Sequence, residues 1–249
     1  MDVSINGAPV YFTLDVFGGI PISATLVVTW VIMLLLTGLC IWMTRDLKVT
    51  GISKKQAVAE FLVTTAENFV LNNMGKKWSN FIPFVAALFA LSICSSLSGL
   101  LGVFAPTADL STELSWAVVV FIMITATKIK TGGLGGYLKG FTQPIFVLTP
   151  FNVISELATP ISMAFRHFGN IVSGTVISTL VYAALTVANR ALFGLIPGFV
   201  GDILGEIPFL TVGIPAVLSL YFDWFSSFMQ AFIFSMLTMM YIATAAEDG

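Results

Sequence analysis

Arg166 lies inside a long apolar stretch, and polar side chains recur on both sides of it at helical spacing. Counted from Arg166, they fall at offsets of −14, −11, −7, −4, +4 and +7, which place them on one face of an α-helix. They are Asn152, Ser155, Thr159, Ser162, Asn170 and Ser173. An arginine at the centre of a membrane helix costs about 2.5–3.5 kcal/mol, and residues that carry this cost usually serve an ion or proton path. The spacing therefore predicts a face that lines water or a partner helix.

A second polar face is predicted near the C-terminus. Its later members are three, four and seven residues from the first, which is again the spacing of one side of a helix. They are Asp223, Ser226, Ser227 and Gln230. Two long helices thus carry opposite formal charges. The alternative is a structural ion pair of Arg166 with Asp223 or Glu156, which would leave the run of hydroxyls and amides unexplained.

His167, the only histidine of the chain, is about 100° round the helix from Arg166 and so lies off the polar face. We therefore expect it to be a packing or interfacial residue rather than a proton relay.

The composition of the 249-residue chain predicts an integral membrane protein, because 57% of its residues are hydrophobic and only 10% are charged. The net charge of −2 offers no basic surface for nucleic acid. The sequence holds no histidine cluster, no paired-carboxylate site, no nucleophile with a base and no phosphate loop. We therefore expect no catalytic site, metal or cofactor on this chain.

The predicted fold class is an all-α integral membrane protein. Residues 1–249 are expected to form a single membrane domain. Apolar runs that can cross a hydrocarbon core of about 30 Å are expected to be its spans. They lie at residues 21–43, 81–105, 114–127, 152–188 and 215–246. The fourth run exceeds one membrane thickness, so that helix must tilt or kink.

The segments between the spans have their own expected roles. Residues 60–78 predict an interfacial amphipathic helix. Residues 106–113 are expected to form an acidic loop that contains Glu113, and residues 128–140 a flexible loop rich in glycine and lysine. Residues 190–213 predict a loop or a pair of short dips.

The distribution of basic residues predicts the orientation of the chain. Nine of the eleven Lys and Arg residues follow the first and third spans, and the acidic loop between them has none. The positive-inside rule then puts the N-terminus outside and the C-terminus in the cytoplasm. Since the first twenty residues lack Lys and Arg, the first run is expected to be a retained anchor rather than a signal peptide.

Two motifs of the chain resemble one known family. FRHFGNIVSG around Arg166 is similar to the RLFGN segment of subunit a of rotary F-type ATP synthases, and MQAFIFSMLTMMYIATAAED is similar to that family's QAFIF ending. PTADLSTELSWAVVVFIMI and the stretch that leads into Arg166 also match, so the resemblance covers nearly the whole chain. It favours the bacterial form of the family and a bacterial plasma (inner) membrane.

The resemblance implies a stator whose last two helices are tilted and lie against a ring of c subunits. Ions, protons by default and Na⁺ as the alternative, would reach a ring carboxylate through one aqueous half-channel and leave through another. Arg166 would attract the deprotonated carboxylate and block leakage between the half-channels. Further partners implied are the b-subunit peripheral stalk, the rest of the F1Fo complex and the lipid bilayer.

The residues expected to translocate ions on this resemblance are Arg166, Asn170, Asp223 and Gln230. Further channel lining is expected from Ser162, Ser173, Thr175, Ser227, Glu156 and Asn152. Several positions depart from the common bacterial pattern: Thr175 replaces an acid, Asp223 a histidine, His167 a leucine and Thr159 a lysine. The acidic group has thus moved to the last helix.

The alternative function is a secondary ion transporter or channel gated by a buried Arg/Asp pair. Such a transporter would need a substrate cavity among broken helices, which the sequence does not mark, and the chain shows no internal repeat. A membrane-embedded enzyme is a third possibility, which the lack of a recognisable catalytic constellation disfavours.

Overall fold

The structure is a computed structural model that describes residues 7–15, 19–195, 210, 217–218 and 220–247. Five helical segments among these residues are long and apolar enough to cross a membrane, which confirms the all-α membrane class. The main helices are α1 (Ala24–Thr44), α2 (Lys54–Met74), α3 (Ile82–Leu97), α4 (Leu110–Gly140), α5 (Thr149–Phe193) and α8 (Ser226–Glu247). Shorter elements are η1 (Lys76–Phe81), η2 (Ser98–Leu101), η3 (Pro106–Ala108), η4 (Phe146–Leu148) and the π-helix η5 (Leu220–Phe225).

A short β-hairpin that the sequence analysis did not predict precedes α1. Strands β1 (Val10–Leu14) and β2 (Ile20–Ser23) pair antiparallel, with Leu14 opposite Ile20. The aromatic and β-branched residues of β1 favour an extended backbone. The first apolar helix therefore begins at Ala24, three residues after the predicted start of the first span.

Helix α2 overlaps the predicted amphipathic segment but begins earlier. Ser53 caps its N-terminus by accepting a hydrogen bond from the backbone N–H of Gln56 at 3.2 Å. Gly75 ends it with a φ of 85°, a conformation that favours glycine. The predicted segment thus divides between α2 and η1.

Helix α4 corrects two of the predicted loops. Asp109 caps it by accepting a hydrogen bond from the backbone N–H of Ser111, so Glu113 lies in the first helical turn rather than in an acidic loop. The helix continues through Lys128 to Gly140, where a flexible loop was predicted. It breaks only at Gly133, whose φ of 72° no other residue type adopts readily.

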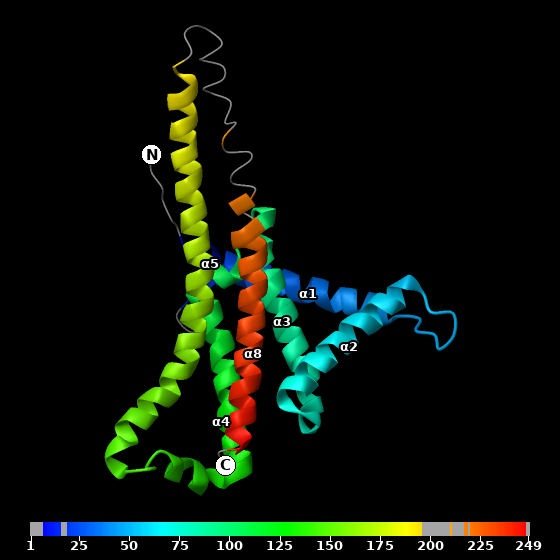
Figure 1. The fold of residues 1–249 in the computed structure, drawn as a ribbon, viewed down its shortest axis with the longest axis vertical. Coiled ribbons are helices and arrows are strands. Elements are labelled where there is room, and N and C mark those ends of the chain that lie inside the picture. The colour runs from blue at the N-terminus through cyan, green and yellow to red at the C-terminus, as the bar shows by residue number, and fades with distance from the viewer. Residues whose placement is uncertain (1–6, 16–18, 196–209, 211–216, 219, 248–249) are drawn as a thin grey trace.

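Helix α5 is the longest element, and its 45 residues span about 68 Å at 1.5 Å per residue. It contains Pro160, which removes one backbone hydrogen bond, and its lower part bends away from the upper part (Figure 1). It extends three residues before and five beyond the predicted range. Most of the rest of the predicted loop, including Asp202 and Glu206, lies outside the described residues.

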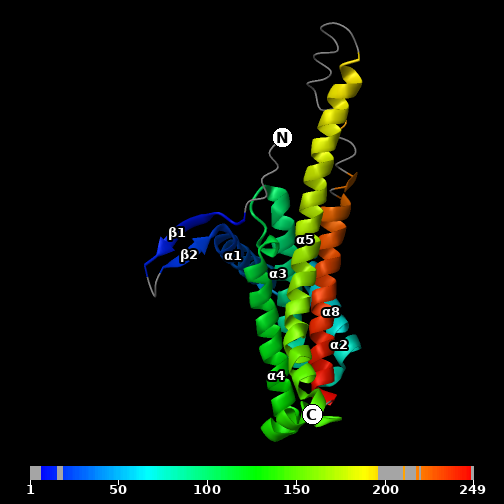
Figure 2. The ribbon, with the colours of Figure 1, turned by 90° about the vertical axis from the view of Figure 1, so that its left-hand side faces the viewer.

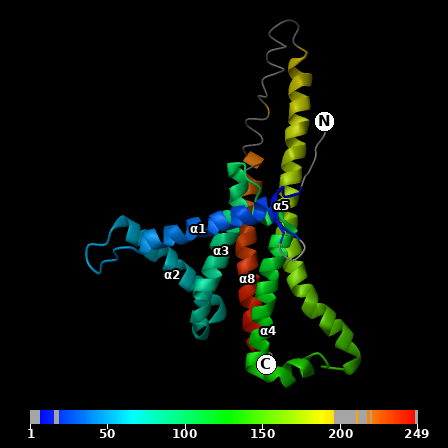
Figure 3. The same cartoon turned by 180° about the vertical axis from the view of Figure 1, so that it is seen from behind.

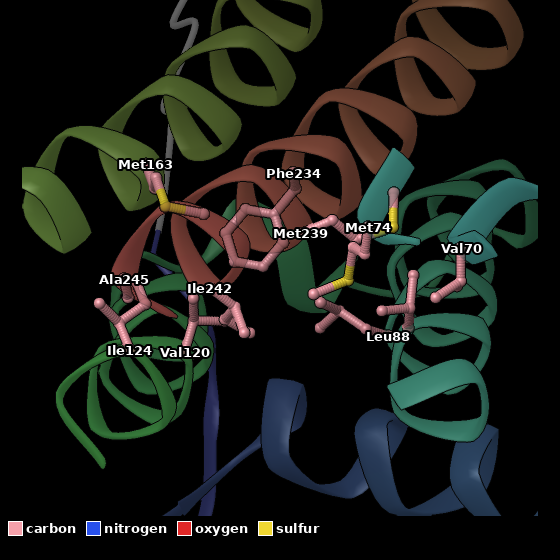
Figure 4. Close-up of a cluster of buried hydrophobic side chains, with 11 residues drawn as sticks. Val70, Met74, Leu88, Val120, Ile124, Met163, Phe234, Met239, Ile242 and Ala245 are labelled. Atoms are coloured by element: carbon pink, nitrogen blue, oxygen red, sulfur yellow. The ribbon is translucent and has the colours of Figure 1, made fainter. Parts of the chain in front are cut away.

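Helices α4, α5 and α8 run side by side, whereas α1 is directed crosswise to them and contacts α3 (Figures 1, 2 and 3). These helices therefore cannot all lie along one membrane normal. The largest buried cluster joins α8 to α2, α3, α4 and α5 (Figure 4). Helix α8 buries a far larger share of its residues than α5, which lies at the edge of the bundle.

Candidate functional site

The polar face of α5 points away from the rest of the described chain. Four members of this face, together with Arg166 itself, are exposed, and two are half-buried. The exposed ones are Ser155, Ser162, Asn170 and Ser173, and the half-buried ones are Asn152 and Thr159. Asn170 donates a hydrogen bond from Nδ2 to the backbone oxygen of Arg166 at 3.1 Å. This outward face therefore presents a guanidinium to whatever covers α5.

The ion pairs of the described residues do not include Arg166. Glu156 pairs instead with Lys128 of α4, whose Nζ lies 2.7 Å from Oε2 and 2.9 Å from Oε1. The structural alternative that paired Arg166 with Glu156 is therefore wrong, and the described contacts hold no pair of Arg166 with Asp223 either.

The second polar face points inward. Ser227 and Gln230 of α8 are buried, and Asp223 of η5 is half-buried. The two predicted faces thus have opposite directions, because α8 lies inside the bundle and α5 lies at its edge.

A cavity of about 310 Å³ opens where the inward face meets α3 and the upper part of α5. Its polar lining comes from Ser96, Thr175, Ser178, Tyr182, Asp223 and Ser227. We call it the Asp223 cavity. Gly174 lies close to Phe222, because a Cβ there would be 3.4 Å from the Phe222 ring and so in van der Waals contact with it.

A second cavity of about 510 Å³ lies between the ends of α4 and α5 that are joined by η4. Its polar lining includes Lys128, Gln143, Asn152, Ser155, Glu156 and Thr159. We call it the Glu156 cavity. Asn152 shapes its wall by donating hydrogen bonds from Nδ2 to the backbone oxygens of Phe141 at 2.8 Å and Gln143 at 3.0 Å.

The two cavities lie on opposite sides of Arg166 along α5. The Glu156 cavity takes its last lining residue at Thr159, and the Asp223 cavity takes its first from α5 at Ile171. At 1.5 Å per residue, these points are about 10 Å and 8 Å from Arg166 along the helix. Arg166 is not among the described residues that line either cavity.

Comparison with known proteins identifies the family to which this chain belongs. Residues 26–243 match the family described as ATP synthase A chain. The chain belongs to the ATP synthase A chain family. The predicted resemblance is thereby confirmed, and with it the assignment to a multi-pass membrane subunit that takes part in ion translocation within the ATP synthase.

Relatives in the family come from several bacteria. ATP synthase subunit a 1 of Prosthecochloris aestuarii is 32% identical over 235 residues, which is 93% of each chain. ATP synthase subunit a of Desulforamulus reducens is 30% identical over 99% of this chain and 89% of its own. The sodium ion specific subunit a of Propionigenium modestum is 29% identical over 93% of this chain and 76% of its own.

The predicted site residues of this ATP synthase A chain lie in four places. Thr175, Asp223 and Ser227 line the Asp223 cavity, and Asn152 and Glu156 line the Glu156 cavity. The outward face holds Arg166, Ser162, Asn170 and Ser173, whereas Gln230 is buried within the bundle.

Sequence reasoning missed the pairing of Glu113 with His167. His167 Nδ1 lies 3.0 Å from Glu113 Oε2, and both side chains are at most 1% exposed. The predicted packing role of His167 is confirmed by its burial between the rings of Trp116 and Phe234, but that role is incomplete. The spacing of residues along the sequence could not reveal this contact, because Glu113 and His167 lie on different helices.

Proposed function

We propose that the Asp223 cavity and the Glu156 cavity are the two half-channels of a stator. Through them, ions reach and leave a carboxylate on a rotating ring of c subunits. The observation that carries this proposal is the position of the two polar cavities on either side of Arg166. A continuous channel would leak ions without turning the ring, so two separate openings are what coupling requires.

Arg166 is the barrier between the half-channels in this account. Its guanidinium is permanently protonated and cannot pass a proton, but it attracts a deprotonated carboxylate in a dehydrated interface. Its exposure on the outward face supports this role, because an unpaired cation in an apolar helix needs a partner from outside the chain. A ring carboxylate supplies the matching charge.

The remaining residues serve the two ion paths. Asp223 exchanges ions with the water in the cavity. Thr175 and Ser227 line the same cavity and offer hydroxyl groups to that water. Glu156 and its partner Lys128 form the charged part of the other half-channel. Asn170, which is exposed on the same face as Arg166, orients water close to it, and Gln230 orients water inside the bundle.

The direction of α1 supports a tilted position for α5 and α8. Since α1 is directed crosswise to both, a membrane-crossing α1 leaves the other two strongly inclined and able to lie along the ring (Figure 3). The proposed orientation has the N-terminus outside the bacterial inner membrane and the C-terminus in the cytoplasm. A b-subunit stalk holds the stator against the ring, and the ion is the proton, with Na⁺ as the alternative.

Sidedness of cysteine labelling tests this proposal. In a background in which Ser replaces the free Cys40 and Cys94, single cysteines would be placed at Thr175 for the Asp223 cavity and at Ser155 for the Glu156 cavity. A membrane-impermeant thiol reagent should label Thr175→Cys only from outside and Ser155→Cys only from the cytoplasm.

Leu34→Cys is the matched control for lipid exposure, because Leu34 is 73% exposed in the middle of the apolar α1. It should resist the reagent from both sides. Labelling of both cavity positions from the same side would contradict the arrangement of two opposed half-channels.

A further inference from the structure

The buried Glu113–His167 pair is the strongest structural feature that the proposed ion path does not use. It joins the first turn of α4 to α5, at the residue that directly follows Arg166. The Lys128–Glu156 pair also joins α4 to α5, but its side chains are 25% and 18% exposed. Of these two contacts, only the Glu113–His167 pair is closed off from solvent and lipid.

Two further helices contact the imidazole. Ser92 of α3 places its Oγ 3.5 Å from Nε2, so both ring nitrogens face polar atoms. Phe234 of α8 and Trp116 of α4 have ring centroids 5.7 Å and 6.4 Å from that of His167. Four helices therefore meet at one side chain, one residue away from Arg166.

The other contacts of α5 at this level give little control over its rotation. Its buried residues here are Pro160, Met163, Ala164 and Gly174, which are apolar and on the same side as His167. Apolar packing is not directional, and flexible methionine adapts to shifted positions. The contact between the buried Glu113 carboxylate and the buried His167 ring nitrogen, 3.0 Å apart, instead joins α5 to α4 at one defined point of its circumference.

We propose that Glu113 and His167 are positioning residues that fix the rotation of α5 about its own axis and thereby hold Arg166 toward the ring. This inference rests on the proposed function of Arg166. Successive helical residues are about 100° apart, so pinning His167 inward determines where the guanidinium of Arg166 points.

The geometry makes coupling sensitive to a small rotation. With side chains about 5–6 Å from the helix axis, a rotation of about 20° displaces the guanidinium by about 2 Å. A misplacement of about 1 Å at a reacting group lowers rates by up to about 100-fold. A buried polar pair is also a weak source of stability, since the desolvation of its groups offsets their attraction, and it is better suited to select one arrangement.

The test compares three variants in vesicles that carry the whole ATP synthase. Glu113→Ala removes the contact, Glu113→Gln keeps a hydrogen-bonding oxygen for the imidazole, and the double exchange Glu113→His with His167→Glu restores a carboxylate–imidazole contact with its partners swapped. The readout is the ratio of ion-driven ATP synthesis to passive ion leak, normalised to the amount of assembled complex.

Glu113→Ala should lower this ratio about tenfold, whereas Glu113→Gln and the double exchange should keep it within about threefold of the parent. Thr125→Val, at a polar position of α4 away from the pair, is the control and should leave the ratio unchanged. A normal ratio in Glu113→Ala would overturn the proposal. So would an assembled Glu113→Gln complex that is as defective as Glu113→Ala.

A second readout detects the rotation of α5 directly, through the reactivity of a cysteine, and does not depend on ATP synthesis. Ala164 is fully buried, so Ala164→Cys in the background lacking Cys40 and Cys94 should resist a small methanethiosulfonate reagent. It should become reactive when Glu113→Ala is added, and continued protection would contradict a rotation of α5.

Arg166→Gln, measured in parallel, separates the two claims. Normal synthesis in Arg166→Gln would refute the proposed function. Lost synthesis in Arg166→Gln together with normal coupling in Glu113→Ala would refute only the positioning role.

Discussion

The polar faces of α5 and α8 have the same periodicity and opposite directions. The face on α5 is turned outward and carries Arg166, whereas the face on α8 is turned inward, with Ser227 and Gln230 buried. The outward face suits an interaction with a partner, and the inward face suits a path within the chain. The same helical spacing of polar residues can therefore produce either an exposed face or a buried one, depending on where the helix lies in the bundle.

The outward face should be the most sensitive to substitution. Arg166→Ala is expected to lower ion-driven ATP synthesis by about 1,000-fold, because it removes the positive charge that is proposed to face the ring carboxylate. Arg190→Ala, the same change near the end of the same helix, should have little effect. Equal losses in both variants, assayed in vesicles with assembled complex, would break the distinction between Arg166 and any other cation of α5.

The inward face should be tested at Asp223. Asp223→Asn is expected to slow ion flux by about 100-fold and to alter its pH dependence, since an amide cannot exchange a proton with the cavity water. The passive proton flux through vesicles is the measurement, with Glu67→Gln on the exposed side of α2 as the control. An unchanged pH profile would make Asp223 a structural residue.

A smaller effect on ATP synthesis is expected from a substitution at Gly174, where α5 contacts Phe222 of η5. Gly174→Val brings a branched side chain against Phe222, at a position where even a Cβ would lie 3.4 Å away. We expect the Asp223 cavity to narrow and ATP synthesis to fall about fivefold. Gly38→Val, where nothing lies within 4 Å of an added Cβ, is the control, and a similar loss in both would argue against a local effect.

The smallest effect is expected at the Glu156 cavity. Lys128→Met removes the partner of Glu156, but both side chains are partly exposed, so the pair contributes little and the remaining carboxylate stays hydrated. ATP synthesis should fall only about twofold. A loss as large as that in Asp223→Asn would mean that Lys128 itself takes part in ion transfer.

Much of the fold could be predicted because a helix that crosses a membrane needs a long run of apolar residues, which is visible in the sequence. Long apolar runs identify helices, and the spacing of polar residues around Arg166 identified a face that the structure also has. The N-terminal hairpin was missed because its strands are short. Residues 128–140 were assigned to a loop because of their glycines, although only Gly133 breaks the helix.

The direction of each face could not be predicted from the sequence. Periodicity is a property of one helix, whereas direction depends on which neighbouring helices cover it, and α5 and α8 have different neighbours. The contact of Glu113 with His167 was hidden for a related reason, since the two residues are on different helices and Glu113 was assigned to a loop. The pairing of Lys128 with Glu156 likewise depends on how α4 and α5 meet.

Passive ion flux through vesicles that carry the assembled complex with Arg166→Gln tests the central claim most directly. The account predicts an ion leak that the parent lacks, together with lost ATP synthesis, because the two half-channels would no longer be separated. Tight vesicles with normal ATP synthesis would contradict it, and Arg166 would then have no part in separating the Asp223 cavity from the Glu156 cavity.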